Sequence, residues 1–399
     1  MTLSWFAIFR LGLVQMCLGA VVVVMTSTLN RLMVVELAMA ATLPGFLVGL
    51  HYIVQLSRPK WGLVSDLENN RTKWILLGML VLGMGANLAT YTLMHFELRP
   101  VFAFALSTFA YTLIGIGVGA SGTSLLALMA KHTQDRRRPA AAMITWLMMI
   151  LGIALTAGIL GQLLTPYSHA RLTTLVLGLT LGTLVLTFIA TWRIERGLVQ
   201  VTSPVGEKTT LLAELQDVWA HSETRNFTIF VFLSMTAYFM QELILEPYAG
   251  LVFAYTPGQT TSLSGVQNGG VFIGMLMVGI LASALKIGSL RTWVKLGCSG
   301  SAVMLVAIMA LGHAPSTLPL EAVVFGLGVF NGMFAVAAIG SMMTLAGSGD
   351  KAREGTRMGL WGAAQAIAAG FGGLLGTILV DLLQILQLST LNAYGTVFL

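Results

Sequence analysis

Long apolar runs separated by short polar segments fill the sequence, and they predict a bundle of membrane-spanning helices. A helix needs about 20 apolar residues to cross the core of a bilayer. Measured against that length, the predicted helices cover residues 6–37, 42–57, 74–95, 101–130, 140–164, 171–192, 226–254, 264–285, 292–312, 319–346 and 356–388. The first helix is long and contains a polar segment at 27–30, where we expect it to bend.

The composition indicates an all-α integral membrane protein and excludes a soluble enzyme. Of the 399 residues, 56% are hydrophobic and 10% are charged, and the mean hydropathy is +0.84. Soluble domains carry about 25% charged residues. The two cysteines, Cys17 and Cys298, both fall inside apolar runs. We expect both to be buried, and neither to form a disulfide or a metal site.

Basic residues predict the orientation of the chain in the membrane. Only Arg31, Arg99 and Arg171 fall on one side of the predicted bundle, and every other Lys and Arg lies on the side of the N-terminus. This distribution puts the N-terminus and the basic loops in the cytoplasm. The net charge of +6 is therefore a topology signal, and we expect no nucleic-acid partner.

Short matches between the two parts of the chain indicate an internal repeat. MTSTLNRLMVVE at 25–36 and MTAYFMQELILE at 235–246 share Met-Thr and a later glutamate at one spacing. A second spacing is shared by two sets of three residues: Asp135, Arg138 and Trp146, and Asp350, Arg353 and Trp361. Matches in the same order predict two parallel six-helix repeats, the arrangement of the major facilitator superfamily fold.

The repeat divides the chain into an N-terminal half at 1–195, a cytoplasmic linker at 196–225 and a C-terminal half at 226–399. A short interfacial helix is expected at 211–219, within the linker. Two six-helix halves need twelve helices, but the chain ends where the twelfth would begin. Either the protein has eleven helices or its C-terminal end is missing here. We favour the missing end, because an unpaired half-repeat would leave packing surface facing lipid.

The loop at 58–74, RPKWGLVSDLENNRTKW, resembles the major facilitator signature between the second and third helices. Gly62, Asp66 and Arg71 occupy the places of its glycine, acid and base, while Asn69-Asn70 replaces an expected glycine. In the superfamily this loop latches the two halves together on the cytoplasmic side through charge pairing. The alternative is an ordinary basic loop with a solvated aspartate.

Six segments spread over nearly the whole chain carry a more specific pattern. They are MTSTLNRLMVVEL, LPGFLVGLHY, RPKWGLVSD, the pair GVGASGTSLLALMA and RRRPAAAMITWLMMI within 116–150, QELILEPYAG and REGTRMGLWGAAQAIAAGFGG. These segments resemble the PucC/LhaA family, the bacteriochlorophyll-delivery branch of the major facilitators.

The resemblance implies a role in assembling light-harvesting antenna complexes in the bacterial inner, or intracytoplasmic, photosynthetic membrane. It implies that the protein binds bacteriochlorophyll or chlorophyll and delivers it to antenna polypeptides, or chaperones those polypeptides. The reaction centre and pigment-synthesis enzymes are further partners that the family suggests, beside the surrounding lipid.

His51 is the one histidine that lies well inside a predicted helix. A neutral imidazole is a good axial ligand for the magnesium of a chlorophyll, and Gln55 lies one turn away on the same face. Two interpretations stay open for this pair. His51 ligates a pigment magnesium, or it is a hydrogen-bonded packing residue.

Polar side chains on the first and seventh predicted helices are the candidates for lining a central cavity. Polar groups in hydrocarbon are costly and usually face a cavity or a partner. Three readings stay open: an internal ion pair between Arg31 and a glutamate, binding of a polar pigment group such as a ring carbonyl or ester, and a proton relay. The candidates are Asn30, Arg31, Glu36, Gln241, Glu242 and Glu246.

Trp146 and Trp361 are each expected about two turns into a helix from the cytoplasmic side. Interfacial anchoring suits an indole at that depth. Stacking on a flat macrocycle is the alternative, for which Gln365 and neighbouring glycines would leave room. The glycines within 115–122 and 370–376 are spaced for close helix packing.

The sequence has no phosphate-cradling loop, no Gly-x-Ser-x-Gly elbow and no paired His/Cys metal set. We therefore expect no enzyme, no nucleotide and no metal beyond that of a bound pigment. Two rivals to pigment delivery stay open. One is a secondary transporter that couples a small solute to protons through Glu36 or Glu246, and the other is a pigment-free scaffold for antenna polypeptides.

Overall fold

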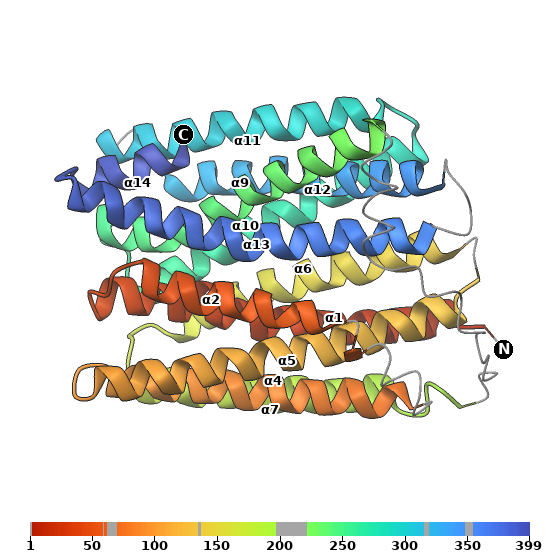
Figure 1. The fold of residues 1–399 in the computed structure, drawn as a ribbon, viewed down its shortest axis with the longest axis horizontal. Coiled ribbons are helices and arrows are strands. Elements are labelled where there is room, and N and C mark those ends of the chain that lie inside the picture. The colour runs from red at the N-terminus through yellow and green to blue at the C-terminus, as the bar shows by residue number, and fades with distance from the viewer. Residues whose placement is uncertain are drawn as a thin grey trace.

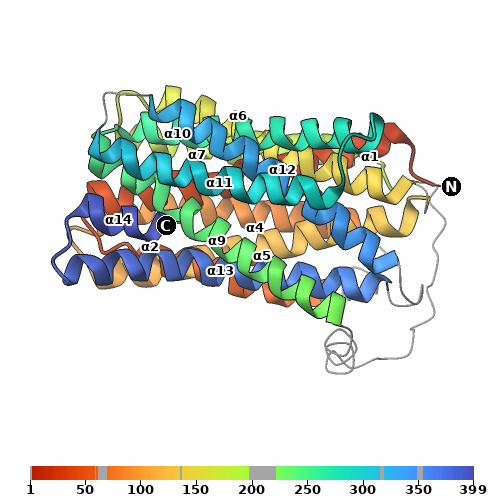
Figure 2. The ribbon, with the colours of Figure 1, turned by 90° about the horizontal axis from the view of Figure 1, so that it is seen from above.

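The computed structural model describes residues 2–58, 60–61, 70–134, 137–196, 222–314, 319–347 and 354–399. The regular structure of these residues is helical throughout, and the long helices run along one common direction (Figures 1 and 2). The N-terminus lies at one end of the bundle and α14 lies toward the other. The all-helical fold predicted from the sequence is confirmed.

Every predicted membrane-spanning helix is present, with changes in its bounds. The first six are α1 (Trp5–Val23) with the π-helical segments η1 (Val24–Leu29) and η2 (Leu32–Glu36), α2 (Thr42–Val54) with η3 (Gln55–Ser57), α4 (Arg71–Thr92) with η4 (Leu93–His95), α5 (Pro100–His132), α6 (Arg138–Leu163) and α7 (His169–Thr191). The others are α9 (Ser222–Phe253), α10 (Pro257–Val278) with η6 (Gly279–Ala284), α11 (Leu290–His313), α12 (Leu320–Gly347) and α13 (Glu354–Ile385). A short helix, α14 (Thr390–Phe398), follows where the twelfth was expected to begin.

Helix α10 begins at Pro257 and not near 264, because its polar first turns lie inside the bundle. Thr256 and Gln259 form a reciprocal capping box that starts the helix. Thr260 and Thr261 are almost fully buried. Apolarity alone cannot detect such a start, since these residues read as a loop in the sequence.

Ten helices in the described ranges are long and apolar enough to cross a membrane, so the chain is a multi-pass membrane protein. Helix α2 falls outside this set because it is short. The predicted linker and its interfacial helix at 211–219 fall almost entirely outside the described residues.

The helix packing repeats between the two halves. In the first half α4 packs on α5 and α7, and α1 packs on α6 and α7. In the second half α11 packs on α12 and α14, and α9 packs on α13 and α14, so each contact has its counterpart. The halves meet where α6 packs on α10 and α2 packs on α13. In Figure 1 the red-to-yellow helices fill the lower part and the green-to-blue helices the upper part.

Glycines allow the closest helix contacts, as their spacing predicts. A Cβ atom on Gly117 of α5 would lie 2.5 Å from the backbone nitrogen of Leu82 in α4, and one on Gly372 of α13 would lie 2.5 Å from the carbonyl oxygen of Thr236 in α9. Close backbone approach at small residues is a main source of helix association in lipid.

The two cysteines differ in environment, and one prediction is wrong. Cys17 of α1 is buried, but Cys298 of α11 is exposed. Helix α11 lies at the outside of the bundle in Figure 1 and buries few of its residues. A membrane helix is apolar on its lipid-facing side as well as its inner side, so an apolar run does not tell which side a cysteine occupies.

Candidate functional site between the two halves

The polar segment of the first helix is wound as a π-helix. Segment η1 covers Val24–Leu29 and η2 covers Leu32–Glu36, where a bend was expected. Single π-helical turns within longer helices occur frequently at functional sites. Four buried polar residues lie in η1 or between η1 and η2: Ser27, Thr28, Asn30 and Arg31.

All four residues bond to the second half, and three of them do so deep in the interface. The hydroxyl of Ser27 donates to Oε1 of Glu246 on α9. Nδ2 of Asn30 donates to the carbonyl oxygen of Leu243 at 2.7 Å, and the hydroxyls of Thr28 and Thr261 on α10 share a hydrogen bond of 3.3 Å. The π-helical segment therefore connects α1 to α9 and α10.

Several buried polar atoms of this interface have no hydrogen-bond partner among the described residues. They include Oε2 of Glu246, both amide atoms of Gln241, Oδ1 of Asn30 and Nε2 of Gln267. A buried polar atom without a partner costs about 1–3 kcal/mol, so such groups call for an explanation. Here they include both hydrogen-bond donors and acceptors.

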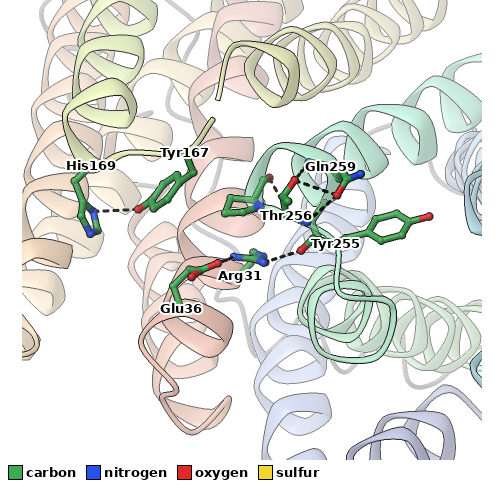
Figure 3. Close-up of polar contacts among 9 residues, drawn as sticks. Arg31, Glu36, Tyr167, His169, Tyr255, Thr256 and Gln259 are labelled. Atoms are coloured by element: carbon green, nitrogen blue, oxygen red, sulfur yellow. Dashed lines mark hydrogen bonds and ion pairs between the residues drawn. The ribbon is translucent and has the colours of Figure 1, made fainter. Parts of the chain in front are cut away.

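Arg31 is held at the end of the bundle opposite the N-terminus. Figure 3 shows its guanidinium between the carboxylate of Glu36, with which Nη1 forms an ion pair, and the backbone of Tyr255, whose carbonyl oxygen accepts from Nη2 at 2.8 Å. Arg31 is buried, but 42% of the Glu36 side chain is exposed. The ion pair is thus a contact at the edge of the interface.

Two tyrosines extend this edge. The hydroxyl of Tyr255 donates to Glu321 at 2.8 Å, and burial together with that carboxylate raises the pKa of Tyr255 to about 12. Tyr167 shares a hydrogen bond of 3.0 Å with Nδ1 of His169 (Figure 3). Burial, with a smaller contribution from the nearby Glu36 carboxylate and against the opposing charge of Arg31, raises the pKa of Tyr167 to about 12. Both phenols stay protonated donors at any physiological pH.

Glu36 and Glu246, which matched in the sequence, do not form a pair. Glu36 is the last residue of the first helix, whereas Glu246 lies well before the end of α9 at Phe253. Glu246 is 4% exposed and bonds to Ser27, while Glu36 bonds to Arg31 near the surface. The two glutamates therefore have different partners and different surroundings.

His51 and Gln55 bond to each other on α2 and η3. Nε2 of His51 lies 2.8 Å from Nε2 of Gln55, whose Oε1 accepts from Arg58. Arg58 thereby orients the amide, so its NH₂ group donates to His51 and the imidazole carries its proton on Nδ1. His51 is 1% exposed, and Nδ1 has no partner in the described part of the chain. A pigment magnesium could take Nε2 only if Gln55 turned away.

Glu242 lies near this cluster. Its charge acts on the hydroxyls of Tyr52 and Tyr238. The ring of Tyr52 meets the edge of Phe239 on α9 at a centroid distance of 5.8 Å. Among the described residues Glu242 has no hydrogen-bond partner, and its side chain is partly accessible.

The remaining candidates are two tryptophans, a glutamine and the residues of the predicted latch. Trp146 on α6 is 36% exposed, and Gln365 on α13 is partly buried. The side chain of Trp361 lies outside the described part of the structure, as do Gly62 and Asp66 of the predicted latch. Arg71, the third latch residue, is buried at the start of α4.

Sequence reasoning missed Asp381 of α13. Its carboxylate accepts hydrogen bonds from the backbone nitrogens of Ala41 and Thr42, at 3.0 and 2.7 Å, and from the Thr42 hydroxyl at 2.6 Å. The signal was available, because Asp381 is an isolated acid in an apolar run, a pattern that marks functional or structural contacts in membrane helices.

The solved structures to which this chain is similar include transporters of the major facilitator type. A POT family transporter in complex with a thioalcohol-conjugated peptide superimposes with a TM-score of 0.72 at 13% identity, over 98% of this chain and 93% of that one. A D-xylose–proton symporter gives a TM-score of 0.67 at 15% identity, over 98% and 95%. The chain therefore has the major facilitator fold.

The chain belongs to the PucC family: the family model described as PUCC protein matches residues 28–399. The relative named "Bacteriochlorophyll synthase 44.5 kDa chain" from Rhodobacter capsulatus is 62% identical over 400 aligned residues, covering 100% of this chain and 92% of the relative. "Protein PucC" of Cereibacter sphaeroides is 27% identical, over 97% and 86%. The family resemblance found in the sequence is confirmed.

Proposed function

We propose that this protein assists the assembly of light-harvesting antennas by binding bacteriochlorophyll or chlorophyll and delivering it to antenna polypeptides. The observation that carries the proposal is membership in the PucC family together with 62% identity to a relative named for bacteriochlorophyll. Pigment is cargo in this proposal, and the antenna polypeptides receive it.

The chemistry of the interface supports a cargo that is mostly apolar with a few polar groups. Gln241, Glu246 and Asn30 present buried donors and acceptors between apolar helices, which suits the carbonyl and ester groups of a tetrapyrrole. His51 offers an imidazole toward the α2 side of the same interface. Trp146 and Gln365 are less well supported, since neither side chain is fully buried.

Location and partners follow from the same proposal. The described basic residues at the N-terminal end, such as Lys73, Lys131 and Arg193, indicate a cytoplasmic N-terminus. The membrane would be the bacterial inner photosynthetic, or intracytoplasmic, membrane. Antenna polypeptides, and beyond them the reaction centre or pigment-synthesis enzymes, would be the partners.

We propose a non-enzymatic role, although the name of the most similar of these relatives contains the word synthase. The transporter fold supports binding and movement of a ligand and gives no reason to invoke a covalent step. The purified protein, supplied with tetrapyrrole precursors, is expected to leave their composition unchanged by chromatography; formation of a new pigment would contradict this role.

The test is an absorption spectrum and a pigment extraction on the gently purified protein. Wild type is compared with Glu246→Gln, His51→Ala and the control His313→Ala, which alters an exposed histidine at the end of α11. Pigment present in the wild type and the control, and reduced in Glu246→Gln, supports the interface as the site. A folded wild-type protein without any pigment or antenna polypeptide would overturn the proposal.

A proton-coupled solute transporter is the second candidate, supported by the fold and by the buried carboxylate of Glu246. It predicts solute uptake that is lost when the proton gradient is dissipated, and that is also lost in the Glu246→Gln variant. A pigment-free scaffold predicts instead that antenna polypeptides co-purify in fixed ratio with no pigment beyond their own.

A further inference from the structure

An apolar groove runs along the outside of the bundle between α4 and α7. It has a volume of about 390 Å³ and its lining is almost wholly apolar. The lining residues are Leu76, Leu77, Leu80, Leu184, Val185 and Phe188. Leu80, Val185 and Phe188 are each about half exposed, so the groove is open toward the surrounding lipid.

One end of the groove is positioned by contacts between the start of α4 and the turn after α7. The backbone nitrogen and the hydroxyl of Thr72 both donate to Oε1 of Glu195, at 2.5 and 2.7 Å. This bridge brings Lys73 and Arg193 to the same end. Lys73 lies one turn before Leu76 and Leu77, so it shares their face of α4.

Aromatic and basic side chains surround that end. The Lys73 ammonium lies 5.5 Å from the ring centroid of Trp74, and the Arg193 guanidinium lies 5.8 Å from that of Trp192. The Trp192 ring in turn meets the edge of Phe188, a lining residue, at 5.1 Å. The charged end and the apolar groove are therefore one continuous surface.

The charge at this end is positive. Lys73, Arg193 and Arg196 are exposed there, and these three cations outnumber the carboxylate of Glu195 beside them. A topology signal requires only that basic residues lie on the correct side of the membrane. Here they also lie at the mouth of a groove whose lining is almost wholly apolar.

We propose that this groove is a binding site for an anionic phospholipid, with its acyl chains along Leu77, Leu80 and Val185 and its phosphate between Lys73 and Arg193. A phosphate accepts charge-assisted hydrogen bonds from both cations, and tryptophan rings favour the headgroup depth. The site is independent of the pigment proposal, because it lies on the outer face of the first half.

The test uses native mass spectrometry of the full-length protein in detergent, titrated with phosphatidylglycerol or with zwitterionic phosphatidylcholine of the same chains. Phosphatidylglycerol is expected to bind more tightly to the wild type. The variant Lys73→Gln with Arg193→Gln removes the headgroup contacts, and affinity is expected to fall about fivefold for each basic side chain removed. Leu80→Trp fills the groove and should weaken the binding of both lipids.

The matched control is Lys295→Gln, which removes a basic residue at the start of α11 on the same side of the membrane. It should bind phosphatidylglycerol as the wild type does. Equal affinity for the two lipids in the wild type, or undiminished phosphatidylglycerol binding by the double charge variant, would overturn the proposal. Both substitutions are at exposed positions, and an unchanged gel-filtration profile confirms that each variant is folded.

Discussion

The carboxylate of Asp381 on α13 caps the first turn of α2 through Thr42, whose backbone nitrogen and hydroxyl both donate to Oδ2. The two residues belong to opposite halves of the molecule. One turn along each helix, Thr377 lies against Gly45 so closely that a Cβ atom on Gly45 would collide with its hydroxyl. The cap and this close packing together hold α2 against α13 at the end of the bundle opposite the N-terminus.

Asp381→Ala is expected to destabilise the protein, because two backbone N–H groups at the start of α2 and the Thr42 hydroxyl lose their acceptor. Loss of a helix cap costs about 0.5–2 kcal/mol, and the melting temperature in detergent should fall accordingly. Asp381→Asn keeps one oxygen acceptor, so its melting temperature should fall less. The control is Leu382→Ala, at an exposed neighbouring position; an equal loss in all three variants would argue against the cap.

The fold was predictable because apolar length and short polar loops determine it. Each helix has a run of apolar residues in the sequence, and the repeated order of loops indicates two similar halves. Two local features escaped this reasoning. The polar start of α10 at Pro257 reads as a loop, and the side of α11 on which Cys298 lies depends on packing, since both sides of the helix are apolar.

The candidate site was predictable only as a set of residues. Isolated polar groups in apolar runs identify Asn30, Arg31 and Glu246 as unusual. Their partners could not be read from the sequence: Ser27 reaches Glu246 from a π-helical turn, and Arg31 bonds to a backbone carbonyl. Such pairings depend on the rotation and depth of neighbouring helices, which no local pattern encodes.

Ser27 and Glu246 are expected to be coupled in stability. Ser27→Ala removes the hydroxyl that donates to the buried carboxylate, and a lost partner of this kind costs about 1–3 kcal/mol. Glu246→Ala removes the carboxylate that accepts this hydrogen bond. Because the same interaction is lost in each, the double variant should be less destabilised than the sum of the single variants. Thermal or denaturant unfolding of the four proteins measures this, and additive losses would contradict the coupling.

Gly117 and Gly178 are expected to respond in opposite directions to alanine. A Cβ atom on Gly117 would lie 2.5 Å from the backbone nitrogen of Leu82, so α4 and α5 would have to separate. Gly178 of α7 has no atom within 4 Å of its added Cβ, and alanine is favoured over glycine in a helix by about 0.5–1 kcal/mol. Gly117→Ala should lower the melting temperature and Gly178→Ala should leave it unchanged or raise it. Equal responses would mean that close packing at Gly117 is unimportant.

Cys298 should react with a small membrane-permeant maleimide in the folded protein, whereas Cys17 should react only after unfolding. The reason is exposure, because Cys298 lies on the outer side of α11 and Cys17 is 1% exposed inside α1. The measurement is the mass shift of intact protein before and after denaturation. One label in the native state and two after unfolding are expected, and Cys298→Ser should abolish the native label while leaving the second. A native label that persists in Cys298→Ser would place Cys17 at an accessible surface and contradict the packing of α1 described above.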